Sequence, residues 1–497
     1  MLKRVFVAPD PGRTRLRFAG RAVLGIGLAV VVCGLTGQSL AGAVTGGLAA
    51  LLALFTVTDA TVRGQAVTTA LLPCAGLPVL TAAAALHDHP VARDLTFLAV
   101  VGAGVYARRW GPRGHSLGVF AFMTFFVAQF LHATTAQLPA LYAAVALSVL
   151  SAAAVRFGLW CYERRQPPPA VPAPSAGRGL ARVTTRQAVQ ATAGAGFALV
   201  VGQLVSGQRW YWAVGATWWI FVNTASRGET VVRGFRRVLG TVLGIGLGLL
   251  VAVPLHGAVV PTAILVAVCV FTIFYSASVS YTWMMLAVTL LAELLYGLLG
   301  VLTPGLLALR FAETGVGALG AVLAVLLVLP VTTHTTTDAW IQRALHCVHT
   351  CTAEATARLA GSTTADPAAR VAELEQLLAR VRQSVAPLVH PLNPALDRKR
   401  RAHRVLALLD DCAHEIHGLT TATAAPETSH DNRLSDACRR VERAVEALTE
   451  GGGATFTAAP TRPPAEPALA HLLGVERALV ELAEPLRVRS GSRLVGA

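Results

Sequence analysis

Positive charge collects at one point between two long apolar stretches, and guanidinium groups in such a place can bind anions. The cluster follows a Trp-rich apolar segment and consists of Arg227, Arg233, Arg236 and Arg237. A full charge at a bilayer centre costs about 2.5 to 3.5 kcal/mol, so these arginines mark a membrane surface. They either anchor the chain to lipid headgroups or form a cytoplasmic funnel that gathers anionic substrates.

The helix predicted to start within this cluster is basic at its beginning and rich in small residues further along. At spacings of three, four and one, a single side of that helix carries Arg233, Arg236, Arg237, Gly240, Thr241 and Gly244. Basic side chains therefore lead into small residues, which allow membrane helices to pack closely.

A second group of charges stands in the last apolar stretch. Arg310 and Glu313 are three residues apart, so they share one helical face and each can neutralise the other inside the membrane boundary. The pair has two interpretations. It fixes this helix against a neighbour, or it belongs to the substrate path, where Arg310 attracts an anion.

Glu293 lies deep in the apolar segment LLAELLYGLL, with no basic residue within one helical turn. A carboxyl buried away from water favours its protonated form, and a group of this kind can carry a coupling proton across a membrane. The alternative is a neutral glutamic acid that is hydrogen-bonded to a facing helix.

Tryptophan, histidine and cysteine residues could also bind a ligand or a metal, but each group has a structural explanation. The tryptophans before the arginine cluster form either an interfacial belt or a stacking site; they are Trp210, Trp212, Trp218 and Trp219. Histidines and cysteines gather at 346–351 and 412–417, but their spacing matches no established zinc site. The sequence contains no nucleotide-binding loop and no nucleophile elbow. We therefore expect no enzymatic activity, no cofactor and no metal.

The composition is that of a membrane protein. Hydrophobic residues make up 54% of the 497 residues and charged residues 14%, far from the balance of a soluble globular protein. Residues 1–330 hold 23 Lys and Arg against 8 Asp and Glu, whereas the remainder holds 19 against 19. Because these arginines flank apolar spans, the basic excess fits the positive-inside rule and does not indicate nucleic-acid binding.

Apolar runs separated by polar breaks predict twelve membrane-spanning helices in two halves, residues 1–162 and 186–330. The fourth span, about 95–107, is short for a full crossing. The proline-rich stretch 163–185 is expected to be a cytoplasmic linker. Arg63-Gly64 and Arg227-Gly228 each follow two spans, which favours a parallel duplication of six spans. If the spans alternate, nearly all basic residues fall on one side, so both termini are expected to be cytoplasmic.

The character of the chain changes after Pro330. Apolar residues recur at helical spacing in residues 331–497, with helices expected near 341–359, 366–385, 396–419, 432–450 and 467–486. Balanced charge allows this tail to form a soluble helical bundle. The predicted fold is therefore all-α: a polytopic membrane protein of two six-span repeats followed by a cytoplasmic helical bundle.

Several of these motifs together resemble the fusaric acid resistance (FUSC) family, to which the aromatic acid exporters belong. The resemblance rests on Tyr211-Trp212, on Arg227 and Thr230, on the run RRVLGTVLG at 236–244, and on the series from Arg310 to Gly317, which is similar to an Arg-x-x-(Asp/Glu)-Thr-x-x-Gly opening of a last span. It covers roughly residues 186 to 330.

The resemblance implies a bacterial plasma (inner) membrane protein that exports small organic acids, aromatic ones in particular, at the expense of the proton gradient. The expected partners are the lipid bilayer, a small organic anion and another copy of the chain. Two alternatives stay open: a passive organic-anion channel, and a membrane-anchored scaffold that transports nothing.

Overall fold

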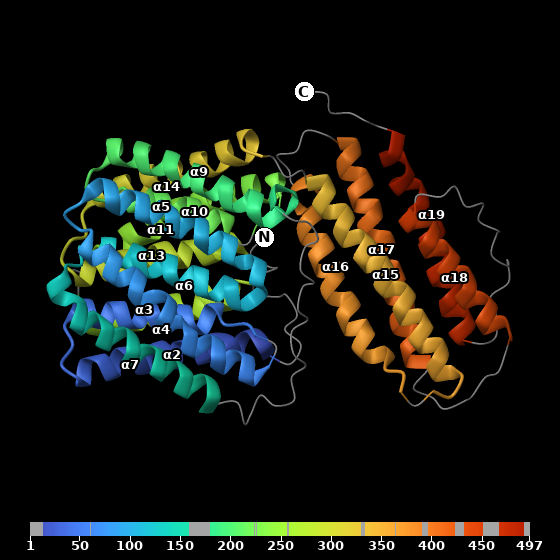
Figure 1. Ribbon diagram of the computed structural model, residues 1–497. Helices are drawn as coiled ribbons and strands as arrows, with labels where there is room; N and C mark the ends of the chain where they lie inside the picture. Colours follow the sequence, from blue (N-terminus) through green and yellow to red (C-terminus); the bar gives the residue numbers. More distant parts are fainter. Residues whose placement is uncertain are drawn as a thin grey trace. The chain divides into compact units, whose positions relative to one another are not determined.

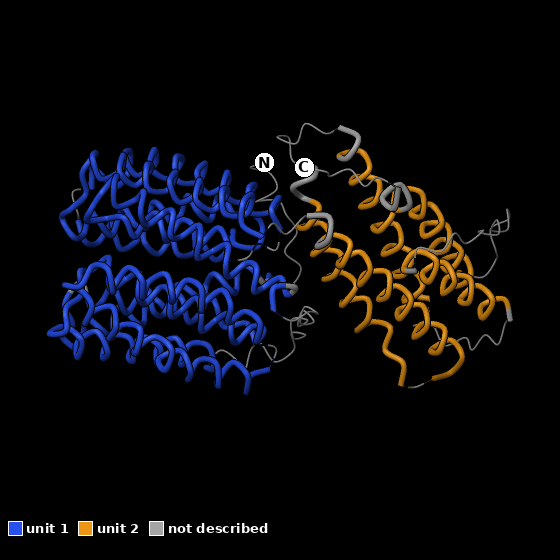
Figure 2. The backbone as a smooth tube through the Cα atoms, turned by 45° about the horizontal axis from the view of Figure 1, so that its top comes forward, with its two compact units in different colours: residues 1–331 blue, residues 332–497 orange. Residues whose placement is uncertain are grey.

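The computed structural model describes residues 13–59, 61–158, 179–222, 224, 226–255, 258–329, 333–362, 364–389, 396–422, 432–450 and 467–491. The chain divides into two compact units, residues 1–331 and 332–497 (Figure 2). All regular structure in the described residues is helical, which confirms the predicted all-α class.

Unit 1 contains two successive sets of six α-helices that run side by side (Figure 1). The first set comprises α2 (Thr14–Leu35), α3 (Leu40–Thr56), α4 (Val62–Ala85), α5 (Pro90–Tyr106), α6 (Gly111–Phe130) and α7 (Leu138–Gly158). The second comprises α9 (Val183–Val205), α10 (Tyr211–Phe221), α11 (Arg227–Val251), α12 (Val259–Ser276), α13 (Tyr281–Leu298) and α14 (Pro304–Leu327). Short 3₁₀ helices η2 (Ala107–Trp110), η3 (Thr135–Gln137) and η4 (Gly179–Ala181) stand between them.

Within the described residues, nine helical stretches are long and apolar enough to cross a membrane, with Pro90–Phe130 counted as one stretch. Three of the twelve predicted spans differ from expectation. The second span is α3, which has 17 residues and whose apolar part, Gly42–Thr56, is shorter than the nine stretches. The helix expected at about 210–225 is α10, which has 11 residues and is thus about 16 Å long, too short to cross a hydrocarbon core of about 30 Å.

The span expected at 95–107 instead begins earlier, at Pro90. Proline is favoured at the first position of a helix because its missing N–H needs no partner there. The added turn brings in Arg93 and Asp94, whose side chains form an ion pair at 3.0 Å. Gln203 of α9 donates a hydrogen bond to Asp94 at 2.6 Å, so the extra charges are neutralised inside the protein.

Helix packing repeats between the two sets. In the first set α2 packs against α3 and α7, α3 against α7, and α4 against α6. The corresponding second-set helices pack in the same way: α9 against α10 and α14, α10 against α14, and α11 against α13. In addition, α5 packs against α9 and α12 against α2, so the fourth helix of each set contacts the first helix of the other.

Small residues on α11 fix the position of α13. The buried residues of α11 recur every three or four positions, with one adjacent pair, and are Thr230, Gly234, Arg237, Gly240, Thr241, Gly244 and Gly248. Of the predicted helix side, Arg233 and Arg236 are only half-buried. A Cβ added at Gly244 would stand 2.6 Å from Cβ of Thr289 on α13. The predicted close packing of α11 is therefore present at its glycines. It fixes where the polar residues of α13 lie along α11.

Unit 2 consists of α15 (Thr333–Leu359), α16 (Pro367–Val389), α17 (Leu396–Ala422), α18 (Asn432–Glu450) and α19 (Pro467–Gly491). These are the five helices expected from the apolar spacing. One core draws on all five helices through Ile341, Val381, Leu409, Val445 and Leu479. Residues 163–178 of the predicted linker lie outside the described residues, and its last part is helical, in η4 and the start of α9.

Candidate functional site

A cavity lies between the two helix sets of unit 1. Its walls come from α3 and α6 of the first set and from α10 to α14 of the second. It holds about 1150 Å³ of empty space, including the part that opens outward. The lining is mainly apolar, and its aromatic members are Phe55, Phe126, Phe130, Trp212 and Trp219. Lining of this kind with few polar groups is typical of sites for small molecules.

The charged side chains in the described lining are Arg237 and Arg310. Both are buried, with 6% and 4% of their surfaces exposed. Burying a cation without a counter-charge costs free energy. An anion bound in the cavity would supply that counter-charge and lower the cost.

Arg310 lies on the second turn of α14, which begins after the capping residue Thr303. Its guanidinium carbon is 3.6 Å from the centre of a Trp212 ring. The indole Nε1 of Trp212 in turn donates a hydrogen bond to the hydroxyl of Tyr296 at 2.8 Å. Among the described residues, Nε and Nη1 of Arg310 have no hydrogen-bond partner. Arg310 is thus held by an aromatic face, which leaves N–H groups for another ligand.

The predicted arginine cluster separates along α11. Arg227 is exposed at the first helical position, and Arg236 is half-buried. Arg233 lies over the Tyr281 ring at 4.1 Å. Arg237 points into the cavity, where Nη1 is 2.9 Å from the sulfur of Met285. A thioether is a weak acceptor, so Arg237 has little compensation for its charge.

The two cavity arginines enter from opposite ends. Arg237 is ten residues beyond the start of α11, about 15 Å along the helix. Arg310 is six residues beyond the start of α14, about 9 Å along it. Three short connections separate these helices in the chain, so α11 and α14 run in opposite directions. Counted along the helices, Arg237 therefore lies nearer the end of the protein at which α11 begins, and Arg310 nearer the end at which α14 begins.

Glu293 is fully buried in α13. Its carboxylate lies so close to α11 that a Cβ added at Gly248 would stand 1.4 Å from Oε2. Neither carboxylate oxygen has a hydrogen-bond partner among the described residues, so no bond to a facing helix is seen there. Glu293 lies just behind the wall formed by Thr289 and Ala292, and the charges of Glu293 and Arg310 act on each other.

The predicted pairing of Arg310 with Glu313 is not found among the described residues. Both oxygens of Glu313 are without a hydrogen-bond partner there. Its Oε2 faces α9, 3.1 Å from where a Cβ of Gly202 would be. Three residues leave two side chains about 60° apart around a helix, and here Arg310 turns to Trp212 in the cavity while Glu313 turns to α9.

The tryptophans do not form an interfacial belt as a group. Trp218 is buried and stacks on Phe122 with ring centres 4.2 Å apart. Trp210 is also buried and meets Phe97 edge-on. Trp212 and Trp219 line the cavity. The belt interpretation is therefore wrong for the two buried indoles, and stacking within the protein describes them.

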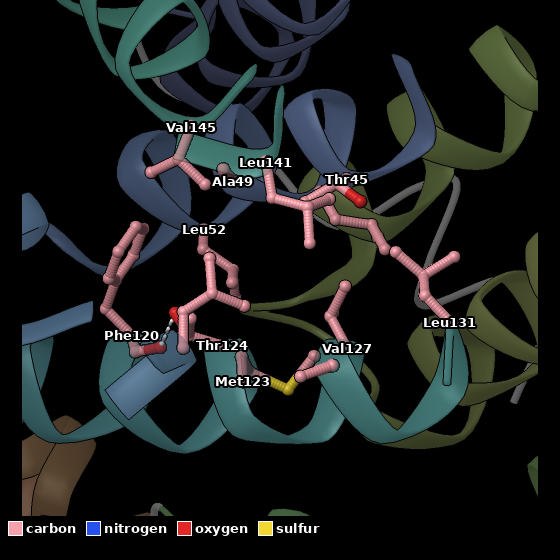
Figure 3. A pocket seen from close by; sticks show the side chains of 13 residues that line it. Thr45, Ala49, Leu52, Phe120, Met123, Thr124, Val127, Leu131, Leu141 and Val145 are labelled. Atoms are coloured by element: carbon pink, nitrogen blue, oxygen red, sulfur yellow. Dashed lines mark hydrogen bonds between the residues drawn. The ribbon is translucent and has the colours of Figure 1, made fainter. Parts of the chain in front are cut away.

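A smaller cavity lies within the first helix set, between α3, α4, α6 and α7, and Figure 3 shows its side chains. It holds about 390 Å³ of empty space and shares Leu48, Leu52, Met123 and Val127 with the larger cavity. Its polar lining residues are Thr45 and Thr124, and the Thr124 hydroxyl is occupied by the Phe120 carbonyl at 2.8 Å. Without a charge in its described lining, this space offers no anion recognition.

In unit 2, no three His, Cys, Asp or Glu side chains of the described residues are placed to hold a metal ion. Three histidines instead face glutamates on neighbouring helices, in the pairs His349 with Glu442, His417 with Glu375 and His471 with Glu415.

Sequence reasoning missed Tyr296, Met285 and Gly248, which hold Trp212, Arg237 and Glu293 respectively. The glycine was detectable, because Gly240, Gly244 and Gly248 continue one spacing of four. Tyr296 and Met285 carry no comparable signal, since their partners are far away in the chain.

Residues 197–324 match the family described as fusaric acid resistance protein-like. The match covers α10 to α13 in full, most of α14 and the C-terminal part of α9 from residue 197. It includes both cavity arginines, Glu293 and Glu313. It confirms the resemblance that the sequence motifs indicated and suggests a membrane transporter or efflux role in general. A search of curated proteins finds no match.

Proposed function

We propose that this chain, with its fusaric acid resistance protein-like segment at residues 197–324, is a proton-driven exporter of small organic acids, aromatic ones above all. One observation carries the proposal. A largely apolar cavity between the two helix sets contains two buried arginines, and N–H groups of both have no partner among the described residues.

Recognition follows from these two kinds of surface. A substrate carboxylate accepts hydrogen bonds from Arg310, which is suited to paired contacts with a carboxylate. An aromatic body packs against Phe126 and Trp212, where ring contacts add about 0.5 to 1.5 kcal/mol beyond burial. Arg237 provides a second position for the anion nearer the other end. A substrate therefore needs one negative group and an apolar body.

Coupling to protons is assigned to Glu293. Its carboxylate and an incoming anion compete for the positive charge of Arg310, so occupancy by the anion favours the protonated form of Glu293. This competition links proton binding to substrate binding, as a coupled carrier requires. Because protons enter the cell down their gradient, export requires that the form carrying both the proton and the anion does not reorient. The proton then moves inward and the anion outward in separate steps.

The experiment is a flux measurement with the full chain in liposomes. An aromatic carboxylate, an aliphatic carboxylate of similar size and an aromatic cation are compared, each with and without a pH gradient. We expect the aromatic carboxylate to move fastest and to accumulate when the gradient is imposed. Arg310→Gln should slow it by about tenfold or more, because a charge-assisted hydrogen bond is worth about 1.5 to 3 kcal/mol. Arg227→Gln removes an exposed charge and is the matched control.

The two alternatives give different results in this assay. A passive organic-anion channel carries the carboxylate at the same rate with and without the pH gradient and never accumulates it. A non-transporting scaffold gives no flux at all, and its tail without the spans would still complement a deletion. Transport of the cation as fast as the carboxylate would contradict the role given to Arg310.

A further inference from the structure

The first turns of α17 carry a dense group of cations. Lys399, Arg400, Arg401 and Arg404, the basic cluster of α17, lie within six residues. Arg400 and Arg404 are exposed, and Lys399 and Arg401 are half-buried. Within the part of the chain that the structure describes, no ion pair or hydrogen bond occupies these four side chains.

The positive charges of this cluster destabilise the helix that carries them. The start of a helix has a partial positive charge, so cations there are unfavourable. Arg400 and Arg404 are four residues apart, a spacing at which like charges repel. Elsewhere in unit 2 arginines face carboxylates, as Arg370 does with Glu354 at 2.8 Å. Folding therefore does not explain the basic cluster of α17.

The position of the cluster points to its partner. Ala402 and Leu409 of α17 share a core with Ile341 and Leu345, which belong to the first half of α15. The cluster thus lies at the end of the bundle where the chain enters from α14. Only five residues lie between Leu327 and Thr333, and the six Cα–Cα steps that join them span about 20 Å at most. Covalent connection therefore keeps the start of α15 close to the end of the last membrane helix.

We propose that the basic cluster of α17 binds the anionic headgroups of the bilayer that the chain spans. Each basic side chain held near an anionic membrane surface strengthens attachment by about fivefold, so four of them give a contact that salt can reverse. The contact ties the bundle down at a second point besides its covalent connection. It rests on the expected cytoplasmic location of unit 2, and it needs no transport activity.

Hydrogen–deuterium exchange of residues 397–409 tests this in the full chain, held in lipid nanodiscs without substrate. Nanodiscs of phosphatidylcholine are compared with nanodiscs that contain about 30% phosphatidylglycerol, an anionic lipid. We expect exchange to be at least about threefold slower with the anionic lipid and to return to its faster rate in about 0.5 M salt. Both leaflets have the same lipid, so the outcome does not depend on membrane orientation.

Two double variants identify the residues. Arg400→Gln with Arg404→Gln should abolish the difference between the lipids. Arg358→Gln with Arg433→Gln removes the same charge from exposed positions near the other end of the bundle and should keep it. Equal exchange in both lipids, or a difference that survives the first double variant, overturns the proposal. Slowing by an added acidic peptide but not by the anionic lipid would assign the cluster to a protein partner and also overturn it. A chain that transports nothing can still pass this test.

Discussion

Gly248 of α11 provides the space that the Glu293 carboxylate of α13 occupies. A Cβ at Gly248 would stand 1.4 Å from Oε2 and 2.6 Å from Cδ of Glu293. No methyl group fits there unless the carboxylate or one of the helices moves. The buried acid and the glycine therefore form one unit, although 45 residues separate them in the chain.

Gly248→Ala should destabilise the protein by about 1 to 3 kcal/mol through overpacking and impair pH-driven flux. In a helix interior this change alone would stabilise by about 0.5 to 1 kcal/mol. Gly246→Ala is the matched control, because a Cβ at Gly246 meets nothing within 4 Å. The unfolding temperature and the pH-driven flux are measured for both variants. Equal values for Gly248→Ala and Gly246→Ala would show that Glu293 does not depend on this space.

Glu293→Gln should separate exchange from accumulation. The amide keeps the shape but cannot carry a proton. We expect this variant to insert normally and to exchange labelled aromatic carboxylate at equal pH. It should fail to accumulate substrate under an imposed pH gradient, and substrate binding should no longer take up a proton, as measured with a pH-sensitive dye. Full pH-driven accumulation by the variant would move the coupling role to another carboxyl such as Glu313.

Arg310 should couple energetically to Trp212 and not to Glu313. A cation held over an indole in a desolvated site contributes about 2 kcal/mol. The single and double variants of Arg310→Ala and Trp212→Ala should therefore show a clear interaction energy in thermal stability. The corresponding cycle with Glu313→Ala should be additive within about 0.5 kcal/mol. A strong coupling in the Glu313 cycle would restore the ion pair that the sequence suggested.

The proposed topology places both termini, the linker around Pro168 and Arg237 toward the cytoplasm, with His89 and Pro304 facing outward. Single cysteines at these positions, in a chain otherwise free of cysteine, are treated in whole cells with an impermeant thiol reagent. Residues 89 and 304 should react and residue 168 should not. Reaction at residue 168 without reaction at residue 89 would invert the assignment.

Acid should weaken unit 2 through Glu354. The hydrogen bond from Arg370 to this carboxyl, 2.8 Å long, holds the pKa of Glu354 below its usual value. Because the folded-state pKa is the lower one, this stabilisation is complete above the unfolded-state pKa of about 4.3 and is lost as the pH falls through the folded-state pKa.

Arg370→Gln should therefore reduce the fall in the unfolding midpoint of unit 2 between pH 7 and pH 3. Arg380→Gln is the control, since Arg380 is exposed and donates a hydrogen bond to the neutral Gln383. If the wild-type chain and Arg370→Gln lose stability equally on acidification, the Glu354 pair does not contribute.

The sequence predicted the helices better than the contacts between them. Apolar runs and breaks determine where a helix begins and ends, so the five helices of unit 2 and most of unit 1 were predictable. The length of α10 was not, because the segment expected to be helical over 210–225 forms a helix only over Tyr211–Phe221. Glu293 was recognisable as buried from its own neighbours. The partner of Arg310 was not recognisable, since helical spacing shows which residues are near and not where long side chains turn.

The reciprocal contacts of α5 with α9 and of α12 with α2 have a consequence for the origin of the protein. Each fourth helix packs on the fifth helix of its own set and also on the first helix of the other set, and the two cross-contacts are equivalent. An interface in which each partner offers the same surface to the other is that of a two-fold symmetric dimer. A gene for one six-helix chain that dimerised in this way would need only a duplication and a joining segment to yield unit 1. In such a fusion the two copies would be free to diverge. Among the described lining residues, the charges of the cavity wall belong to the second helix set alone.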